Sequence, residues 1–150
     1  IEVNEAQKAR MINKIRKALG GDESNKTVAV LGLTFKPETD DMREAPSLDI
    51  LPALQAAGAA IRAYDPEGME EAKGRLADVF WCENAYETME GADVLTIITE
   101  WNEFRALNFD RVKSLLKKPV MVDLRNIYNP GEMAEAGFEY TCLGRPGAAS

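Results

Sequence analysis

The 150-residue chain has a formal net charge of −7, which argues against nonspecific binding to nucleic acid or to an anionic membrane surface. It contains no histidine, and Cys82 and Cys142 lack the paired spacing of metal ligands, so we expect no metal site and two packed, unreactive thiols. Its length and 45% hydrophobic content suit one soluble domain. No apolar run is long enough to span a membrane, and we expect the protein in the cytoplasm.

Residues 1–19 place apolar side chains at helical spacing and end at Gly20 and Gly21, which predicts an amphipathic helix. Because the chain has no initiator methionine and begins inside this pattern, we expect a fragment whose first helix starts upstream. The helix could cap this domain, or it could connect to an upstream domain and form a dimer seam. We favour the connector for residues 1–21.

The rest of the chain alternates short apolar runs with helical patterns. We expect strands at residues 27–33, 60–64, 79–82, 92–99, 119–124 and 138–142. We expect helices at residues 46–57, 69–77, 86–90, 109–116 and 130–136. This alternation predicts an α/β fold, a Rossmann-like doubly wound parallel sheet of about six strands in the order 3-2-1-4-5-6. The domain should span residues 22–145, with residues 146–150 as a disordered tail.

A loop dense in charge follows the first predicted strand. In open α/β sheets, ligands bind at the carboxyl ends of the strands where the strand order reverses. Lys36 and Arg43 follow the first strand and Arg125 follows the fifth, so the predicted order places all three at one edge. Three cations suit a diphosphate, because arginine can grip phosphate oxygens bidentately. Trp101 lies on a neighbouring loop, where a core position is a better interpretation than stacking on a ligand.

Each of these charged residues also has a structural interpretation. Lys36 and Arg43 could instead form ion pairs with acids of their own loop, and the sequence does not decide between ligand binding and such pairing. These acids are Glu38, Asp40, Asp41 and Glu44. The two aspartates of the loop suit backbone hydrogen bonds better than a metal ion. For Asp65, a role in the turn outweighs a contact to a ribose.

A dinucleotide-binding strand is followed by Gly-x-Gly-x-x-Gly, which lets the backbone approach a pyrophosphate. Residues 32–37 contain only Gly32. The sequence therefore predicts Rossmann architecture without the nicotinamide fingerprint.

The segment Gly32-Leu-Thr-Phe-Lys-Pro-Glu-Thr-Asp-Asp-Met-Arg-Glu-Ala-Pro-Ser47 resembles the signature that opens the C-terminal domain of the nucleotide-sugar dehydrogenases. Thr99-Glu-Trp-Asn-Glu-Phe-Arg105 and Asp123-Leu-Arg-Asn126 are most similar to the UDP-glucose 6-dehydrogenase branch. The resemblance covers nearly the whole chain. Residues 1–19 resemble the end of the central helical region that joins the two domains of that family and forms its homodimer.

The resemblance implies the UDP-sugar-binding domain of an enzyme that oxidises UDP-glucose to UDP-glucuronate with two NAD, bound mainly by the enzyme's own N-terminal domain. By matching motif positions, Phe35 and Lys36 would border the sugar and Arg125 would serve the substrate site. Arg43 would reach the NAD pyrophosphate across the domain cleft.

The catalytic cysteine and lysine of the family lie upstream of this chain. The resemblance therefore implies no catalytic residue here, and we expect the fragment alone to be inactive. The alternatives are the same domain of a UDP-N-acetylmannosamine or GDP-mannose dehydrogenase, or a free-standing nucleotide-binding module.

Overall fold

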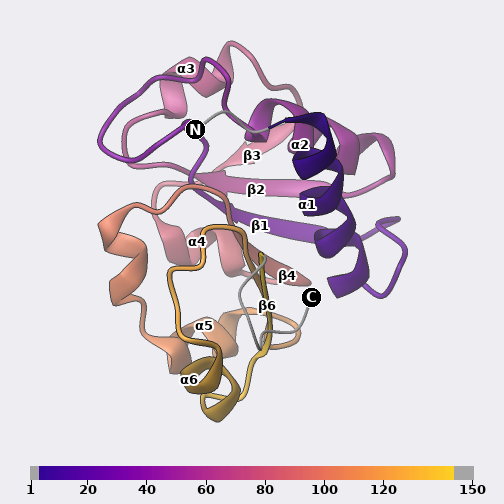
Figure 1. The fold of residues 1–150 in the computed structure, drawn as a ribbon, viewed down its shortest axis with the longest axis vertical. Helices are drawn as coiled ribbons and strands as arrows, with labels where there is room; N and C mark the ends of the chain where they lie inside the picture. The colour runs from indigo at the N-terminus through magenta and orange to yellow at the C-terminus, as the bar shows by residue number, and fades with distance from the viewer. Residues whose placement is uncertain (1–3, 144–150) are drawn as a thin grey trace.

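The computed structural model describes residues 4–143, so the expected tail at residues 146–150 lies outside the described residues (Figure 1). The chain forms one six-stranded sheet, in which all neighbouring strands are parallel and the order is β3-β2-β1-β4-β5-β6. This order and the doubly wound α/β class confirm the prediction. The strands are β1 (Thr27–Leu31), β2 (Ala60–Tyr64), β3 (Val79–Trp81), β4 (Val94–Ile97), β5 (Val120–Asp123) and β6 (Glu139–Cys142).

The central strand β1 feeds two separate hydrophobic cores. Val28 and Val30 pack into the core on one face of the sheet, while Ala29 and Leu31 pack into the core on the other face. Side chains of a strand alternate between faces, so a strand covered on both sides must be apolar at every position. This requirement explains the continuous apolar run that marked β1 in the sequence.

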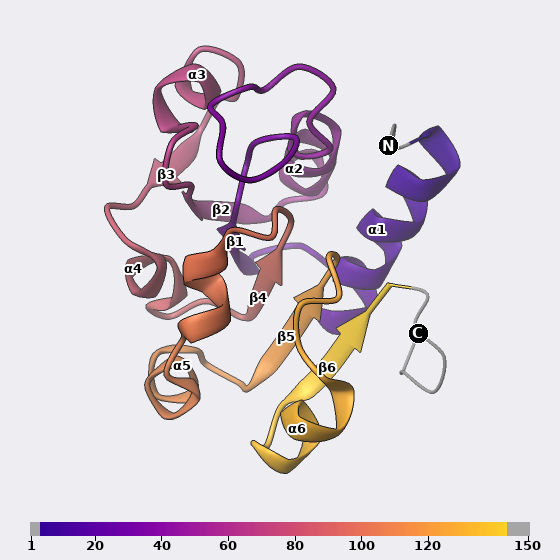
Figure 2. The same cartoon turned by 60° about the vertical axis from the view of Figure 1, so that its left-hand side comes forward.

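Helices cover both faces of the sheet (Figure 2). The helices are α1 (Glu5–Ala18), α2 (Ser47–Ala56), α3 (Met69–Lys73), α4 (Ala85–Met89), α5 (Phe109–Leu115) and α6 (Pro130–Glu135). The first three helices contribute to one core and the last three to the other. A 3-10 helix, η1 (Asn102–Ala106), was not predicted. None of the helices within residues 4–143 is long and apolar enough to cross a membrane.

Within the described residues, helix α1 begins at Glu5 with Asn4 as its N-cap, whereas the apolar pattern predicted a helix from residue 1 onward. The side chain of Asn4 accepts a hydrogen bond from the Gln7 backbone N–H at 2.9 Å, and Gln7 Oε1 accepts one from the Asn4 backbone N–H at 3.1 Å. This reciprocal capping box satisfies two backbone donors that a helix leaves free at its start. The helix therefore starts at Glu5 rather than at residue 1.

The apolar stripe of α1 packs on its own domain. Met11, Ile15 and Leu19 are buried in the core that the helix forms with α2 and the sheet, and α1 contacts β4 and β5. These side chains are thus covered without a partner, as in the interpretation of a helix that caps the domain. The connector and dimer roles of residues 1–21 stay predictions.

Gly32 ends β1 in a conformation that other residues avoid. Its φ is +89°, and a Cβ at this position would lie 2.5 Å from the Thr99 Cβ and 2.6 Å from the Thr99 nitrogen. The chain can pass over the end of β4 only because residue 32 has no side chain.

We therefore predict that Gly32→Ala lowers the free energy of unfolding by about 2–5 kcal/mol, through backbone strain and overpacking together. Urea denaturation measures the loss. Gly20→Ala is the matched control, because Gly20 has a φ of +87° and no atom lies within 4 Å of the position that its Cβ would take. Equal losses in the two variants would contradict the close approach to Thr99.

Candidate functional site

The strand order reverses at β1, because the chain passes from β1 outward to β2 and β3 and then returns to β4 on the other side of β1. Strand β1 thus pairs with β2 on one side and with β4 on the other. Beyond the carboxyl end of β1, the chain runs as a loop from Gly32 to Pro46 before α2 begins. This is the point where open α/β sheets bind ligands.

The start of this loop is fixed by the buried carboxylate of Asp65, which follows β2. Asp65 Oδ2 accepts hydrogen bonds from the Leu33 N–H at 2.6 Å and from the Thr34 N–H at 3.1 Å. The same oxygen contacts the Thr34 hydroxyl and the Trp101 Nε1–H, each at 3.3 Å. Asp65 Oδ1 accepts from the N–H groups of Glu67 and Gly68. Asp65 therefore has a structural role in the turn, and Trp101 is buried beside it, as the core interpretation expects.

Further hydrogen bonds hold the loop against neighbouring elements. The Ser47 hydroxyl donates to the Leu33 carbonyl at 2.7 Å, and the Thr99 hydroxyl donates to the Thr34 carbonyl at 2.6 Å. The loop closes on itself where the Phe35 N–H donates to the Asp41 carbonyl at 3.1 Å. The backbone that carries Phe35 and Lys36 is thus connected to α2 and to the segment that follows β4.

A second buried carboxylate, Asp123 at the end of β5, shapes the turn that carries Arg125. Asp123 Oδ1 accepts from the Arg125 N–H at 3.1 Å, and Oδ2 accepts from the Tyr140 hydroxyl at 2.6 Å. Oδ2 also accepts from the backbone of residues 127 and 128. Asn126 then joins the turn to the end of β6 through two 2.9 Å hydrogen bonds with the Leu143 backbone.

A cavity of about 240 Å³ opens at this edge of the sheet. Three of its lining residues, Phe35, Lys36 and Arg125, are those that the sequence assigned to the substrate. The remaining lining residues come from α1, the loop, and the ends of β4, β5 and β6; they are Gln7, Met11, Pro46, Ile98, Leu124 and Leu143. The structure thus gathers the three predicted substrate residues around one space.

The three predicted cations have different surroundings. Arg125 Nη2 donates to Glu100 Oε2 at 2.7 Å. Lys36 is exposed, lines the cavity, and forms no ion pair within residues 4–143. Arg43 is not part of the cavity lining.

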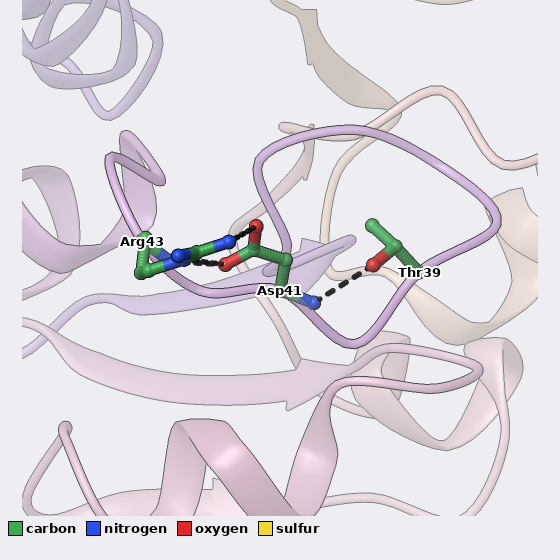
Figure 3. A network of polar contacts seen from close by, with 3 residues as sticks. All are labelled: Thr39, Asp41 and Arg43. Carbon is green, nitrogen blue, oxygen red and sulfur yellow. Dashed lines mark hydrogen bonds and ion pairs between the residues drawn. The ribbon is translucent and has the colours of Figure 1, made fainter.

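Arg43 is instead bound to Asp41 of its own loop (Figure 3). Its Nε and Nη2 each lie 3.0 Å from a carboxylate oxygen of Asp41, and its side chain is 80% exposed. The Asp41 backbone N–H is in turn held by the Thr39 hydroxyl at 3.1 Å (Figure 3). The sequence left open whether these cations pair with a loop acid. The structure confirms such a pair for Arg43, and Lys36 forms none within the described part of the chain.

The cysteines are placed as packed thiols. Both are buried, and burial raises the pKa of the Cys82 thiol to about 11. A thiol with so high a pKa is almost entirely protonated near neutral pH, so Cys82 is a poor nucleophile.

Sequence reasoning missed the contribution of α1 to the cavity, through Gln7 and Met11, and the role of Glu100 beside Arg125. Glu100 stands in the Thr99-Glu-Trp segment that we singled out, but its partner lies beyond another strand. The packing of α1 over this edge left no local signal in the sequence.

A six-stranded, doubly wound parallel sheet with a cation-lined cavity at its switch point is typical of nucleotide-binding domains. Residues 29–130 match the model of the UDP-glucose/GDP-mannose dehydrogenase family, UDP binding domain. The chain belongs to this family.

Named relatives agree with this membership. A UDP-glucose 6-dehydrogenase of Rhizobium meliloti (strain 1021) is 52% identical over 97% of this chain and 33% of its own length. Among solved structures, a UDP-glucose dehydrogenase of Pyrobaculum islandicum has a TM-score of 0.75 at 30% identity, covering 91% of this chain and 29% of that one. A UDP-D-ManNAc dehydrogenase of Pyrococcus horikoshii has a TM-score of 0.77 at 27% identity, covering 95% and 32%. This chain spans about one third of the length of each.

We predict that Asp65→Asn lowers the free energy of unfolding by about 2 kcal/mol or more, because the amide presents N–H donors to groups that are themselves donors. Urea denaturation gives the value. Asp22→Asn serves as the control, because Asp22 accepts a hydrogen bond from the Ser24 N–H at 2.9 Å on an exposed turn. This substitution should lower the free energy of unfolding by well under half as much. A wild-type stability for Asp65→Asn would show that the buried carboxylate is dispensable.

A second prediction concerns acid titration of the loop. Hydrogen bonds from Arg43 lower the pKa of Asp41 from 3.8 to about 2, so its stabilising contribution is complete above pH 3.8 and is lost as the pH falls through 2. Carboxyl-carbon NMR should show this midpoint, and Arg43→Ala should move it back toward 3.8. Lys36→Ala should leave it in place. An unchanged Asp41 midpoint in Arg43→Ala would mean that the ion pair does not form in solution.

Proposed function

We propose that this chain forms the substrate-binding part of an NAD-dependent dehydrogenase that oxidises UDP-glucose to UDP-glucuronate with two NAD. The observation that carries the proposal is the cavity at the switch point, which is lined by Phe35, Lys36 and Arg125. Arginine can bind phosphate oxygens bidentately, while an aromatic ring beside a lysine offers the sugar both apolar surface and hydrogen-bond donors. In this proposal, Phe35 and Lys36 border the sugar and Arg125 binds the substrate.

The choice of nucleotide sugar rests on sequence identity. The relative from Rhizobium meliloti, at 52% identity, is named for UDP-glucose, whereas the relative named for UDP-D-ManNAc is 27% identical. UDP-glucose is therefore the favoured substrate over UDP-N-acetylmannosamine or GDP-mannose.

The small volume of the cavity supports a site that a second domain completes. Its volume of about 240 Å³ is below the range of about 300–1,000 Å³ that is usual for small-molecule sites. We propose that an N-terminal domain of the same enzyme completes the site, that residues 1–21 connect the two domains, and that the enzyme is a cytoplasmic homodimer. Helix α1 already borders the cavity through Gln7 and Met11, which suits a connecting element.

The residues of this chain do not fit NAD by themselves. The loop after β1 has a single glycine in residues 32–37, and the chain enters α2 only at Ser47 rather than through the short glycine-rich turn that brings a backbone close to a pyrophosphate. We propose that NAD and the catalytic residues belong mainly to the N-terminal domain. Arg43, exposed and outside the cavity, is the residue of this chain that would extend toward the NAD pyrophosphate.

We predict that the chain binds UDP and UDP-glucose in preference to NAD, as measured by calorimetric titration. Arg125→Ala should weaken UDP-glucose binding by roughly 10- to 150-fold, because loss of a charge-assisted hydrogen bond costs about 1.5–3 kcal/mol. Arg43→Ala is the matched control, since it removes the same charge from outside the cavity and should leave the affinity unchanged. Tight binding of NAD without binding of UDP-glucose would overturn the proposal.

A further inference from the structure

The guanidinium of Arg125 is held at one point. Its Nη2 donates to Glu100 Oε2 at 2.7 Å, and no other hydrogen bond of the guanidinium occurs among residues 4–143. Arginine has five N–H donors, so most of them remain available. Arg43 differs, because Asp41 occupies two of its nitrogens at once.

The ion pair links two strand ends of the site. Glu100 lies beyond β4, Arg125 lies beyond β5, and the two side chains are 24% and 37% exposed. Water and salt weaken the attraction between the two charges less in a partly sheltered ion pair than in a fully exposed one. The contact therefore restrains a long side chain that would otherwise sample many rotamers.

The second oxygen of Glu100 points to a role beyond packing. Glu100 Oε1 is buried and has no hydrogen-bond partner within the described part of the chain. An unpaired buried carboxylate oxygen costs free energy, so native proteins tend to keep one where the residue serves another purpose. Here the only partner of the carboxylate within residues 4–143 is the cation of the cavity.

We propose that Glu100 is a positioning residue for Arg125, which it pre-organises for the phosphate oxygens of the nucleotide; the inference rests on the function proposed for the cavity. A side chain that is ordered before binding loses less conformational entropy when the ligand arrives. Glu100 also brings a negative charge near the diphosphate, and this repulsion acts in the opposite direction. The two effects are separable, because only positioning requires Arg125 to be present.

The test is a double-mutant cycle on UDP affinity, measured by calorimetry on the 150-residue chain. Glu100→Ala should weaken UDP binding by roughly three- to tenfold, the cost of one newly mobile side chain. Glu100→Gln should bind UDP within about twofold of the wild-type value, because its amide oxygen accepts the same hydrogen bond from Arg125. In the Arg125→Ala background, Glu100→Ala should cause no further weakening.

Glu103→Ala is the matched control, an exposed glutamate three positions along the same segment, and it should leave UDP affinity unchanged. If Glu100→Ala does not fold, Glu100→Ser replaces it in the cycle. Unchanged or tighter UDP binding in Glu100→Ala would overturn the positioning role alone. So would a weakening by Glu100→Ala that persists in the Arg125→Ala background. A wild-type chain that binds no UDP would overturn the proposed function, and this inference with it.

Discussion

The buried carboxylate of Asp65 is the constraint on which the site depends. A buried charge is costly unless hydrogen bonds compensate for it, so donors must converge on this position when the chain folds. They come from the loop after β1, from the turn after β2 and from the indole of Trp101 beyond β4. One side chain at the end of β2 therefore fixes the start of the loop that carries Phe35 and Lys36.

Asp123 fixes the backbone of the other half of the site, as Asp65 fixes the backbone of the first half. It organises the turn after β5 through backbone donors and the Tyr140 hydroxyl, and Arg125 stands on that turn. At both strand ends, the acid is turned inward and saturated with donors, while the neighbouring cation faces the cavity.

The fold could be predicted from the sequence because burial on both faces of a parallel sheet requires continuous apolar runs, as in Thr27–Leu31. The strand order followed from the alternation of strands with helices. The ends of elements were less well predicted: α3 stops at Lys73, well short of the expected residue 77, and α1 begins at Glu5. Caps of a few polar atoms decide such ends, and these are weak signals beside apolar periodicity.

The sequence by itself determined the class of fold and the edge of the sheet where Lys36 and Arg125 meet, because strand ends in a known order share an edge, and the family resemblance added Phe35 to them. Only the tertiary structure decided which cations face the cavity. Arg43 is closer to Lys36 along the chain than Arg125 is, yet Asp41 holds it elsewhere. Likewise, Glu100 reaches Arg125, and Gln7 and Met11 reach the cavity, only through packing between distant segments. Such contacts depend on side-chain geometry across strands and helices, which local sequence patterns do not encode.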